Sequence, residues 1–430
     1  MRRDPSLPIR RRSASGDFRR RWRRLGVGLL AAALAPASSG AEAPLWWYAS
    51  TTSNQSLPAQ IAGDGVSNAI VYNTRGDLPA ARTFLDRAAA AGVGVVMDVG
   101  RDFVAAGDLG SLENYVNELK DHPALTGWYL YDEPNEIGIT VGEADAAYRR
   151  VRSLSPLLIY GAIDADRPST QRDYIDTLDR LITFEYPFDV GDDEFEGLED
   201  RFFGLLPGWK RITADSAARA RAEGKGWYHA LQAYGRDGDS PSLRLVTDAE
   251  LRFMAFYSLV AHDADGVMFW ARYRTDRSDA LPGEPFEQGG AAWRRDLFVP
   301  LAIEFSDHYG DAVESGAIVG GVSSSDGDVF ADVYRDPEDG GLFLLVVNDE
   351  NAARTATLSL DSGLGVLREA NRLDGAGVLA IDGQQLAVSL PAYGTASYRL
   401  VPSRVIPEPV ASGAVLMTGF CLAMRRGRVE

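Results

Sequence analysis

Cysteine and histidine are scarce in this sequence of 430 residues. The single cysteine, Cys421, lies within the last ten residues, and the chain contains four histidines. One cysteine excludes an intramolecular disulfide and any cysteine-ligated metal centre in the body of the protein. Four histidines also argue against a histidine-rich metal cluster. We therefore expect no metal and no cofactor.

Positive charge is scarce once the two ends of the chain are set aside. The whole chain has a formal net charge of −17, but residues 1–41 carry +8 and residues 403–430 carry +2, which leaves −27 on the body. Such a charge opposes binding to nucleic acid or to anionic lipid. Hydrophobic residues make up 45% of the sequence, which is ample for a large packed core.

The N-terminal end lacks an apolar run long enough to span a membrane. An arginine-rich segment, 10–24, is followed by an apolar stretch, 25–34, and then by small residues at 38–41. This order is typical of a secretory signal peptide, which we place at residues 1–41. A membrane anchor is the alternative, but about ten apolar residues are too few to cross a bilayer.

The C-terminal end combines three features in order. Pro-Glu-Pro at 407–409 is followed by an apolar run, 410–424, and by Arg425, Arg426 and Arg428. Residues 406–430 resemble the PEP-type C-terminal sorting signal of exosortase substrates, which implies processing at the cell surface by an exosortase-type enzyme. A plain C-terminal anchor is the alternative. Both readings predict an exported protein, at the cell surface or extracellular, that meets the membrane only through this segment.

Eight short apolar runs alternate with helical patterns through the body of the chain. The runs are 45–48, 69–72, 93–99, 127–131, 157–163, 181–186, 227–233 and 266–270. Strands that alternate with helices indicate parallel βαβ units, and eight such units predict a closed (β/α)₈ barrel of the α/β class over residues 45–312. An open doubly wound sheet is the alternative, although no glycine-rich phosphate loop follows the first run.

The pattern changes from about residue 317. Short alternating strands are expected at 329–334, 342–347, 355–360 and 395–400, separated by turn residues and without helix signals. Residues 317–402 therefore predict a small all-β sandwich after the barrel. The segment 390–400 is similar to the closing strand of the β-domains that follow many glycosidase barrels.

The strongest local signal lies at the end of the fourth apolar run. There Asp132 and Glu133 come just before Pro134, and barrel active sites are built at the C-terminal ends of strands. The segment 122–135 resembles the fourth strand of clan A glycoside hydrolases, where an Asn-Glu-Pro ending supplies the general acid/base. The resemblance implies that role for Glu133. Asp132 stands where that pattern has asparagine.

The second carboxylate of a glycosidase is harder to assign. Clan A enzymes place a nucleophilic glutamate at the end of strand seven, where this chain has Gln232, and an amide cannot act as that nucleophile. Glu185, at the end of the sixth run, is one candidate. Asp132 is another, if it assists a 2-acetamido group of the substrate while Glu133 acts as acid/base. Adjacent strand residues face opposite sides, so both reach the mouth only if the strand ends or bulges there.

Aromatic and polar residues near strand ends suit a sugar site, because sugar faces stack on rings while polar groups fix orientation. Trp270 resembles the strand-eight tryptophan of clan A. The candidate substrate-binding residues are Asn73, Asp98, Tyr131, Tyr186, Gln232, Tyr234, Trp270 and Arg272. Two hypotheses follow: an exported glycoside hydrolase acting on a surface or environmental polysaccharide, and a carbohydrate-binding barrel that has lost turnover.

Overall fold

The computed structural model describes residues 45–49, 52–72, 74–187, 198–235, 244–276, 278 and 289–403. The predicted signal peptide, the predicted sorting segment and the candidate residue Asn73 lie outside the described residues. Within the described part of the chain, no helix has both the length and the apolar character that a membrane crossing requires.

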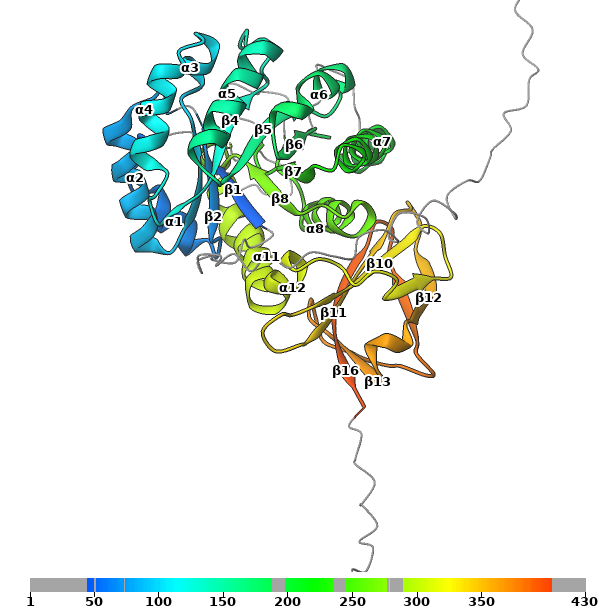
Figure 1. Ribbon diagram of the computed structural model, residues 1–430. Coiled ribbons are helices and arrows are strands. Elements are labelled where there is room, and N and C mark those ends of the chain that lie inside the picture. The colour runs from blue at the N-terminus through cyan, green and yellow to red at the C-terminus, as the bar shows by residue number, and fades with distance from the viewer. Residues whose placement is uncertain are drawn as a thin grey trace, which may run out of the picture. The chain divides into compact units, whose positions relative to one another are not determined.

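Parallel strands form a closed barrel (Figure 1). Each strand pairs with the next one along the chain, and β1 pairs with β8 to complete the circle. The barrel strands are β1 (Leu45–Ala49), β2 (Asn68–Val71), β3 (Gly94–Asp98), β4 (Leu125–Asp132), β5 (Leu158–Asp164), β6 (Arg180–Phe184), β7 (Gly226–Gln232) and β8 (Gly266–Trp270). The predicted fold class is therefore confirmed, and the open doubly wound sheet is excluded.

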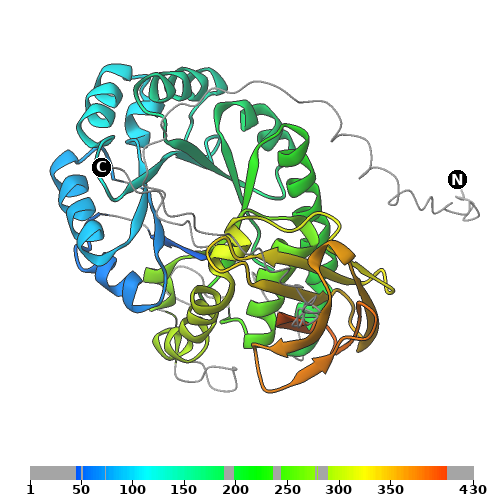
Figure 2. The same cartoon turned by 60° about the horizontal axis from the view of Figure 1, so that its bottom comes forward.

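Helices surround the strands of the barrel (Figure 2). They are α1 (Leu57–Gly63), α2 (Leu78–Ala91), α3 (Arg101–Ala105), α4 (Leu109–Leu119), α5 (Val141–Leu154), α6 (Pro168–Tyr174), α7 (Leu198–Ala222), α8 (Asp248–Phe256), α9 (Arg272–Thr275), α10 (Gly290–Trp293), α11 (Val299–Glu304) and α12 (Gly310–Glu314). Short 3₁₀ or π segments extend several of them, such as η3 (Tyr257–Ala261) after α8.

Local sequence signals fix the ends of these helices. The Asp77 side chain accepts a hydrogen bond from the backbone N–H of Ala80 at the start of α2, and Gly92 ends the helix with φ of 70°. Helices α5 and α8 begin with reciprocal capping boxes, formed by Thr140 with Glu143 and by Thr247 with Glu250. These caps place each helix start directly after a loop that leaves the C-terminal end of a strand.

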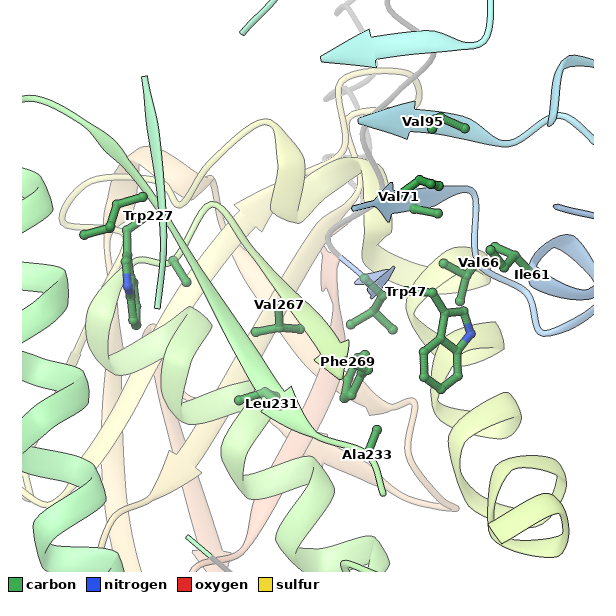
Figure 3. Packing of buried hydrophobic residues seen from close by; sticks show 14 of the residues in the cluster. Trp47, Ile61, Val66, Val71, Val95, Trp227, Leu231, Ala233, Val267 and Phe269 are labelled. Atoms are coloured by element: carbon green, nitrogen blue, oxygen red, sulfur yellow. The ribbon is translucent and has the colours of Figure 1, made fainter. Parts of the chain in front are cut away.

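The barrel has two separate apolar layers. Outward side chains, such as Val71, Leu231 and Phe269, pack against the helices, as Figure 3 shows for part of this layer. Inward side chains fill the interior, and that set is rich in aromatic residues, including Trp46 and Tyr160. The interior is therefore packed with side chains, which leaves chemistry to the rim at the C-terminal strand ends.

The β-domain after the barrel has two antiparallel sheets. One has the order β10 (Val329–Arg335), β11 (Leu342–Asn348), β16 (Thr395–Pro402), β13 (Leu367–Arg372) and β14 (Val378–Ala380), and the other has β15 (Gln385–Leu390), β12 (Arg354–Leu360) and β9 (Val322–Ser324). Their inner faces share one apolar core, which includes Leu344, Leu358 and Val388. This is the predicted all-β sandwich.

Polar and aromatic contacts join the barrel helices to this domain. Lys210 Nζ of α7 lies 2.6 Å from an oxygen of Asp349, and the Ser397 hydroxyl donates to Glu304 Oε1 at 3.1 Å. The rings of Phe253 and Tyr393 meet edge to face with centroids 5.1 Å apart. The β-domain is thus bound to the helices that follow β6, β7 and β8.

Candidate active site

Carboxylates gather where three consecutive strands end. Asp132 closes β4 and Glu133 follows it, Asp164 closes β5, and Glu185 comes directly after β6. All four side chains are partly exposed. Parallel barrel strands deliver their C-terminal ends to one rim, so these acids share the face where barrel enzymes act.

A β-bulge in β4 decides which side chains face inward. Tyr129 lies opposite Tyr160 of β5, but Tyr131 lies opposite Gly161, so one residue of β4 is left over between them. As a result Tyr129 and Asp132 both face the interior, where the Tyr48 hydroxyl donates to Asp132 Oδ1 at 3.3 Å. The bulge precedes Asp132, and β4 ends at Asp132, so alternation along the strand does not extend to Glu133.

Glu133 sits in an unusual backbone conformation just past the bulge. Its φ is 46°, in the left-handed region that few residues other than glycine adopt, and its N–H donates to the Ala162 carbonyl oxygen at 2.9 Å. A non-glycine residue held there costs about 1 to 3 kcal/mol, and such strain is concentrated at functional sites. The turn carries the chain away from the strand directly after Asp132.

The pKa of Glu133 is raised to about 7. Partial burial is the main cause, and the nearby charges of Asp132 and Asp164 add to it, while Arg167 opposes it. A carboxyl group in this state keeps its proton at nearly neutral pH. It is suited to give that proton to a leaving group and to take it back.

The Asp132 carboxylate is hydrogen-bonded by tyrosine side chains from two strands, β1 and β4. Burial raises its pKa to about 6, and hydrogen bonds from the Tyr129 and Tyr48 hydroxyls, together with the charge of Arg101, hold it from rising further. The two tyrosine hydroxyls also contact each other. Asp132 is thus a fixed carboxylate beside Glu133, with acceptor oxygens only when it is ionised.

Asp164 is a site residue that the sequence analysis missed. Burial raises its pKa to about 6, its carboxylate accepts from the Asp166 N–H at 3.1 Å, and Arg167 Nε lies 3.7 Å away. It is also one of the charges that raise the pKa of Glu133. An acid directly after the fifth apolar run was the signal that could have identified it.

One group of described residues has the ligand spacing of a cation site. Oxygens of Asp164, Asp166 and Glu185 all lie within 4.8 Å of one another. Clustered carboxylates are the ligands that hard cations prefer. Arg167 already brings positive charge here, because its Nε lies 3.7 Å from Asp164 and 3.9 Å from Asp166.

Aromatic rings flank the carboxylates. Trp270 lies against Tyr48 and Tyr72, with ring centroids 4.6 Å and 5.1 Å away. Tyr186 meets Tyr234 edge to face at 5.6 Å. Trp270, Tyr72 and Tyr186 are partly exposed, whereas Tyr234 is buried beneath Arg274, whose guanidinium lies 4.3 Å from the ring centre. The partly exposed rings offer faces on which a sugar can stack.

Two of the predicted substrate-binding residues instead bind the protein's own backbone and side chains. Gln232 is fully buried at the end of β7, and its Nε2 donates to the carbonyl oxygens of Tyr234 and Arg244 at 3.1 and 3.0 Å. Arg272 is 5% exposed, and its Nε donates to Asp64 at 2.7 Å. Neither side chain is presented to a substrate, which corrects both assignments.

Asp98 and Tyr131 are also placed away from a substrate. Asp98 is buried, and its oxygens accept from the N–H groups of Thr74, Gly100 and Arg101 at 2.9 to 3.0 Å, so it organises two loops rather than binding hydroxyls. The bulge turns Tyr131 outward, where its hydroxyl meets Thr177 at 2.8 Å. The predicted binding role of each is corrected for these reasons.

A hollow of 280 Å³ lies at the opposite end of the barrel, by the starts of β6 and β7. Arg180, Arg221 and Lys225 line it together with two aspartates, Asp263 and Asp265. Arg221 pairs with Asp263 at 3.1 Å, and Lys225 donates to the Leu178 carbonyl. These cations serve the protein itself, and this end of a barrel serves stability.

No family model matches the sequence, and no curated protein matches it. Solved structures do share the fold. The α-amylase from Geobacillus thermoleovorans, complexed with acarbose, aligns with a TM-score of 0.53 at 7% identity over 84% of this chain and 99% of its own.

Two further structures align over similar lengths. The GH27 β-L-arabinopyranosidase from Geobacillus stearothermophilus aligns with a TM-score of 0.51 at 13% identity over 85% of this chain and 98% of its own. A family 5 glycoside hydrolase from Bacteroides vulgatus aligns with a TM-score of 0.51 at 14% identity over 83% and 89%. At these identities the likeness is one of fold alone.

Proposed function

We propose that this protein is a glycoside hydrolase in which Glu133 is the general acid/base. The observation that carries the proposal is the state of Glu133: partly exposed at the C-terminal end of β4, with a pKa raised to about 7. Cleavage of a glycosidic bond needs a group that is protonated near neutral pH and that touches the leaving oxygen. Of the acids gathered at this rim, Glu133 has the highest of the pKa values given above.

The second carboxylate comes from the same side of the mouth. Gln232 cannot serve, because it is an amide and is buried against backbone carbonyls. Glu185 and Asp132 remain the candidates, the first as nucleophile or base and the second as a partner for a substrate acetamido group. Asp164 joins them, since it lies close enough to Glu133 to raise its pKa. The carboxylate used will set whether the anomeric configuration is retained or inverted.

Further support comes from the surroundings of these acids. Partly exposed rings of Trp270, Tyr72 and Tyr186 flank them, as a sugar-binding site requires. The similar folds belong to glycoside hydrolases, among them an α-amylase bound to acarbose and an arabinopyranosidase. The two terminal segments also support a proposed cellular location. Residues 1–41 would direct export, and residues 406–430 would direct sorting to the surface by an exosortase-type enzyme.

A second candidate function is a carbohydrate-binding barrel without turnover. The observation that favours it is Gln232, because strand seven supplies no carboxylate where clan A enzymes have their nucleophile. The same aromatic faces would then bind a polysaccharide at the surface.

The test uses the purified full chain with a panel of aryl glycosides and bacterial polysaccharides. For a hydrolase we expect release of reducing sugar that disappears in Glu133→Gln. The matched control is Glu118→Gln, which removes an acid of α4 that pairs with Arg82 on the outer surface. Saturable sugar binding without release, unchanged by Glu133→Gln, would instead establish the binding barrel. If the chain neither releases nor binds sugar, both candidate functions are contradicted.

A further inference from the structure

Two tyrosines at the top of the barrel interior converge on Asp132. Tyr48 comes from β1 and Tyr129 from β4, and both side chains are buried. The Tyr48 hydroxyl donates to Asp132 Oδ1 at 3.3 Å, Tyr129 is hydrogen-bonded to the same carboxylate, and the two hydroxyls are in contact. We call Tyr48 and Tyr129 the tyrosine pair.

The hydrogen count of this group favours an ionised Asp132. Each hydroxyl carries one hydrogen, and a carboxylate has only acceptors. Both hydrogens therefore end on Asp132, either directly or through the other hydroxyl, as a chain of bonds that strengthen one another. A protonated Asp132 would lose acceptor capacity and would bring a third hydrogen that needs an acceptor of its own. Because both tyrosines are buried, solvent has little access to replace either donor.

We propose that the tyrosine pair consists of positioning residues, which hold Asp132 as a charged acceptor and through it set the protonation of Glu133. The proposal rests on the proposed function, because only an acid/base role gives the protonation of Glu133 a consequence. Asp132 reaches the pair only because the bulge in β4 puts it on the same face as Tyr129. The tyrosine pair, the bulge and Glu133 thus form one arrangement.

Asp132 is one of several charged groups that influence the protonation of Glu133. Other titratable or charged groups also face these two acids. From β3 and its loop come Asp98 and Arg101, and from the loop after β5 comes Arg167. The remaining titratable groups around the two acids are Tyr72, Glu136, Asp164 and Tyr186. None of them is removed by a change in the tyrosine pair, so substitutions there isolate the contribution that passes through Asp132.

The test is a titration of the full chain with ¹³C-labelled carboxyl groups of aspartate and glutamate, followed by NMR. The signals of Asp132 and Glu133 are identified by their loss in Asp132→Asn and Glu133→Gln. In Tyr48→Phe and in Tyr129→Phe we expect the pKa of Asp132 to rise by about one unit, since a donor to its charged form is gone. The pKa of Glu133 should fall by about half a unit, because Asp132 is then neutral over more of the range.

Tyr131→Phe is the matched control. It removes a hydroxyl from the same strand, but one that meets Thr177 outside the barrel. It should leave both titrations unchanged, and Asp132→Asn should lower the pKa of Glu133 more than either change in the tyrosine pair. Unchanged titration of Glu133 in both Tyr48→Phe and Tyr129→Phe would overturn the proposal, as would an equal shift in Tyr131→Phe. Using both members of the pair protects the test against one variant that fails to fold.

The titration needs no substrate, so it separates this inference from the proposed function. Altered titrations in a protein that hydrolyses no glycoside would contradict the proposed function alone. Hydrolysis that disappears in Glu133→Gln, with an unmoved Glu133 titration in the tyrosine variants, would contradict this inference alone. Where a substrate is found, the alkaline limb of the pH–rate profile should move to lower pH by the same half unit in both tyrosine variants.

Discussion

Two regions of the barrel mouth both consist of strand ends but differ in what their polar groups do. The ends of β4 to β6 are called the first half below, and the ends of β7 and β8 the second half. Where β4 to β6 end, Asp132, Glu133 and Glu185 are partly exposed. Where β7 and β8 end, Gln232 and Arg272 are buried and bound by the protein itself. The second half contributes the ring of Trp270, while the first contributes the acids and the ring of Tyr186.

The difference shows that position at a strand end does not make a residue reactive. Gln232 and Arg272 occupy places that are functional in many barrels, yet their hydrogen-bonding capacity is taken up by Arg244 and Asp64. A buried polar group whose bonds are satisfied is part of the scaffold. The acids of the first half retain solvent exposure and raised pKa values, which are the properties that proton transfer needs.

Glu133→Gln should produce the largest effect on the reactive half. Loss of general acid catalysis lowers turnover by about 10² to 10⁴-fold. Stability near neutral pH should change little, because Glu133 is partly exposed and forms no ion pair with the residues that the structure describes. Initial rates on the substrate found in the panel, with urea unfolding of both proteins, check the two statements. If Glu133→Gln instead unfolds at a clearly lower urea concentration than the unchanged protein, Glu133 belongs with the scaffold.

Arg272→Met should produce the largest loss of stability in the scaffold half. It leaves Asp64, which is almost fully buried, with Arg294 as its remaining cationic partner. Removing one member of a buried ion pair costs about 3 to 5 kcal/mol. Urea unfolding measures this cost. Arg295→Met is the control, because its pair with Asp296 is exposed and contributes about 1 kcal/mol or less.

Gln232→Met tests the scaffold role with a smaller change. It keeps the side-chain volume but leaves the carbonyl oxygens of Tyr234 and Arg244 without this donor. We expect a loss of about 1 to 3 kcal/mol in the free energy of unfolding. The pH at which Glu133 titrates should stay the same. A shift of that pH with unchanged stability would move Gln232 into the reactive half.

The smallest expected effect is the pH dependence of stability. The pKa of Glu133 is about 7 in the folded protein and lies lower in the unfolded chain, so unfolding releases a proton between these values. Its contribution to stability is therefore complete at acid pH and is lost as the pH rises through about 7. Buried Asp98 acts in the same direction near pH 6. Glu133→Gln should show a weaker decline between pH 5 and 8 in urea unfolding, and an equal decline would contradict the raised pKa.

The barrel was predictable because its signal is periodic. The runs expected at 69–72 and 266–270, for example, match β2 (Asn68–Val71) and β8 (Gly266–Trp270) within one residue. Four short strands of the β-domain escaped prediction: β9, β13, β14 and β15. Two of these, β9 and β14, have only three residues, which is too short for alternation to show.

The candidate site was predictable only in part. Asp132 and Glu133 were found because an acidic pair before a proline ends an apolar run. The bulge that turns Tyr131 outward leaves no mark in the order of residues. The partners of Arg272 and Gln232 come from loops that are distant in sequence, such as Asp64, 208 positions away from Arg272. Pairings of that kind are set by the tertiary fold.

The extra residue in β4 also bears on how this strand is compared with others. Counting from Tyr129, a regular strand would put Asp132 on the wall opposite to the one it occupies, since faces alternate with a period of two. Removal of one residue, such as Leu130, would restore simple alternation and still leave Tyr129 and Asp132 on the same face, two positions apart. Any alignment or grafted design that treats the stretch from Tyr129 to Asp132 as regular will therefore transfer Asp132 to the outer wall.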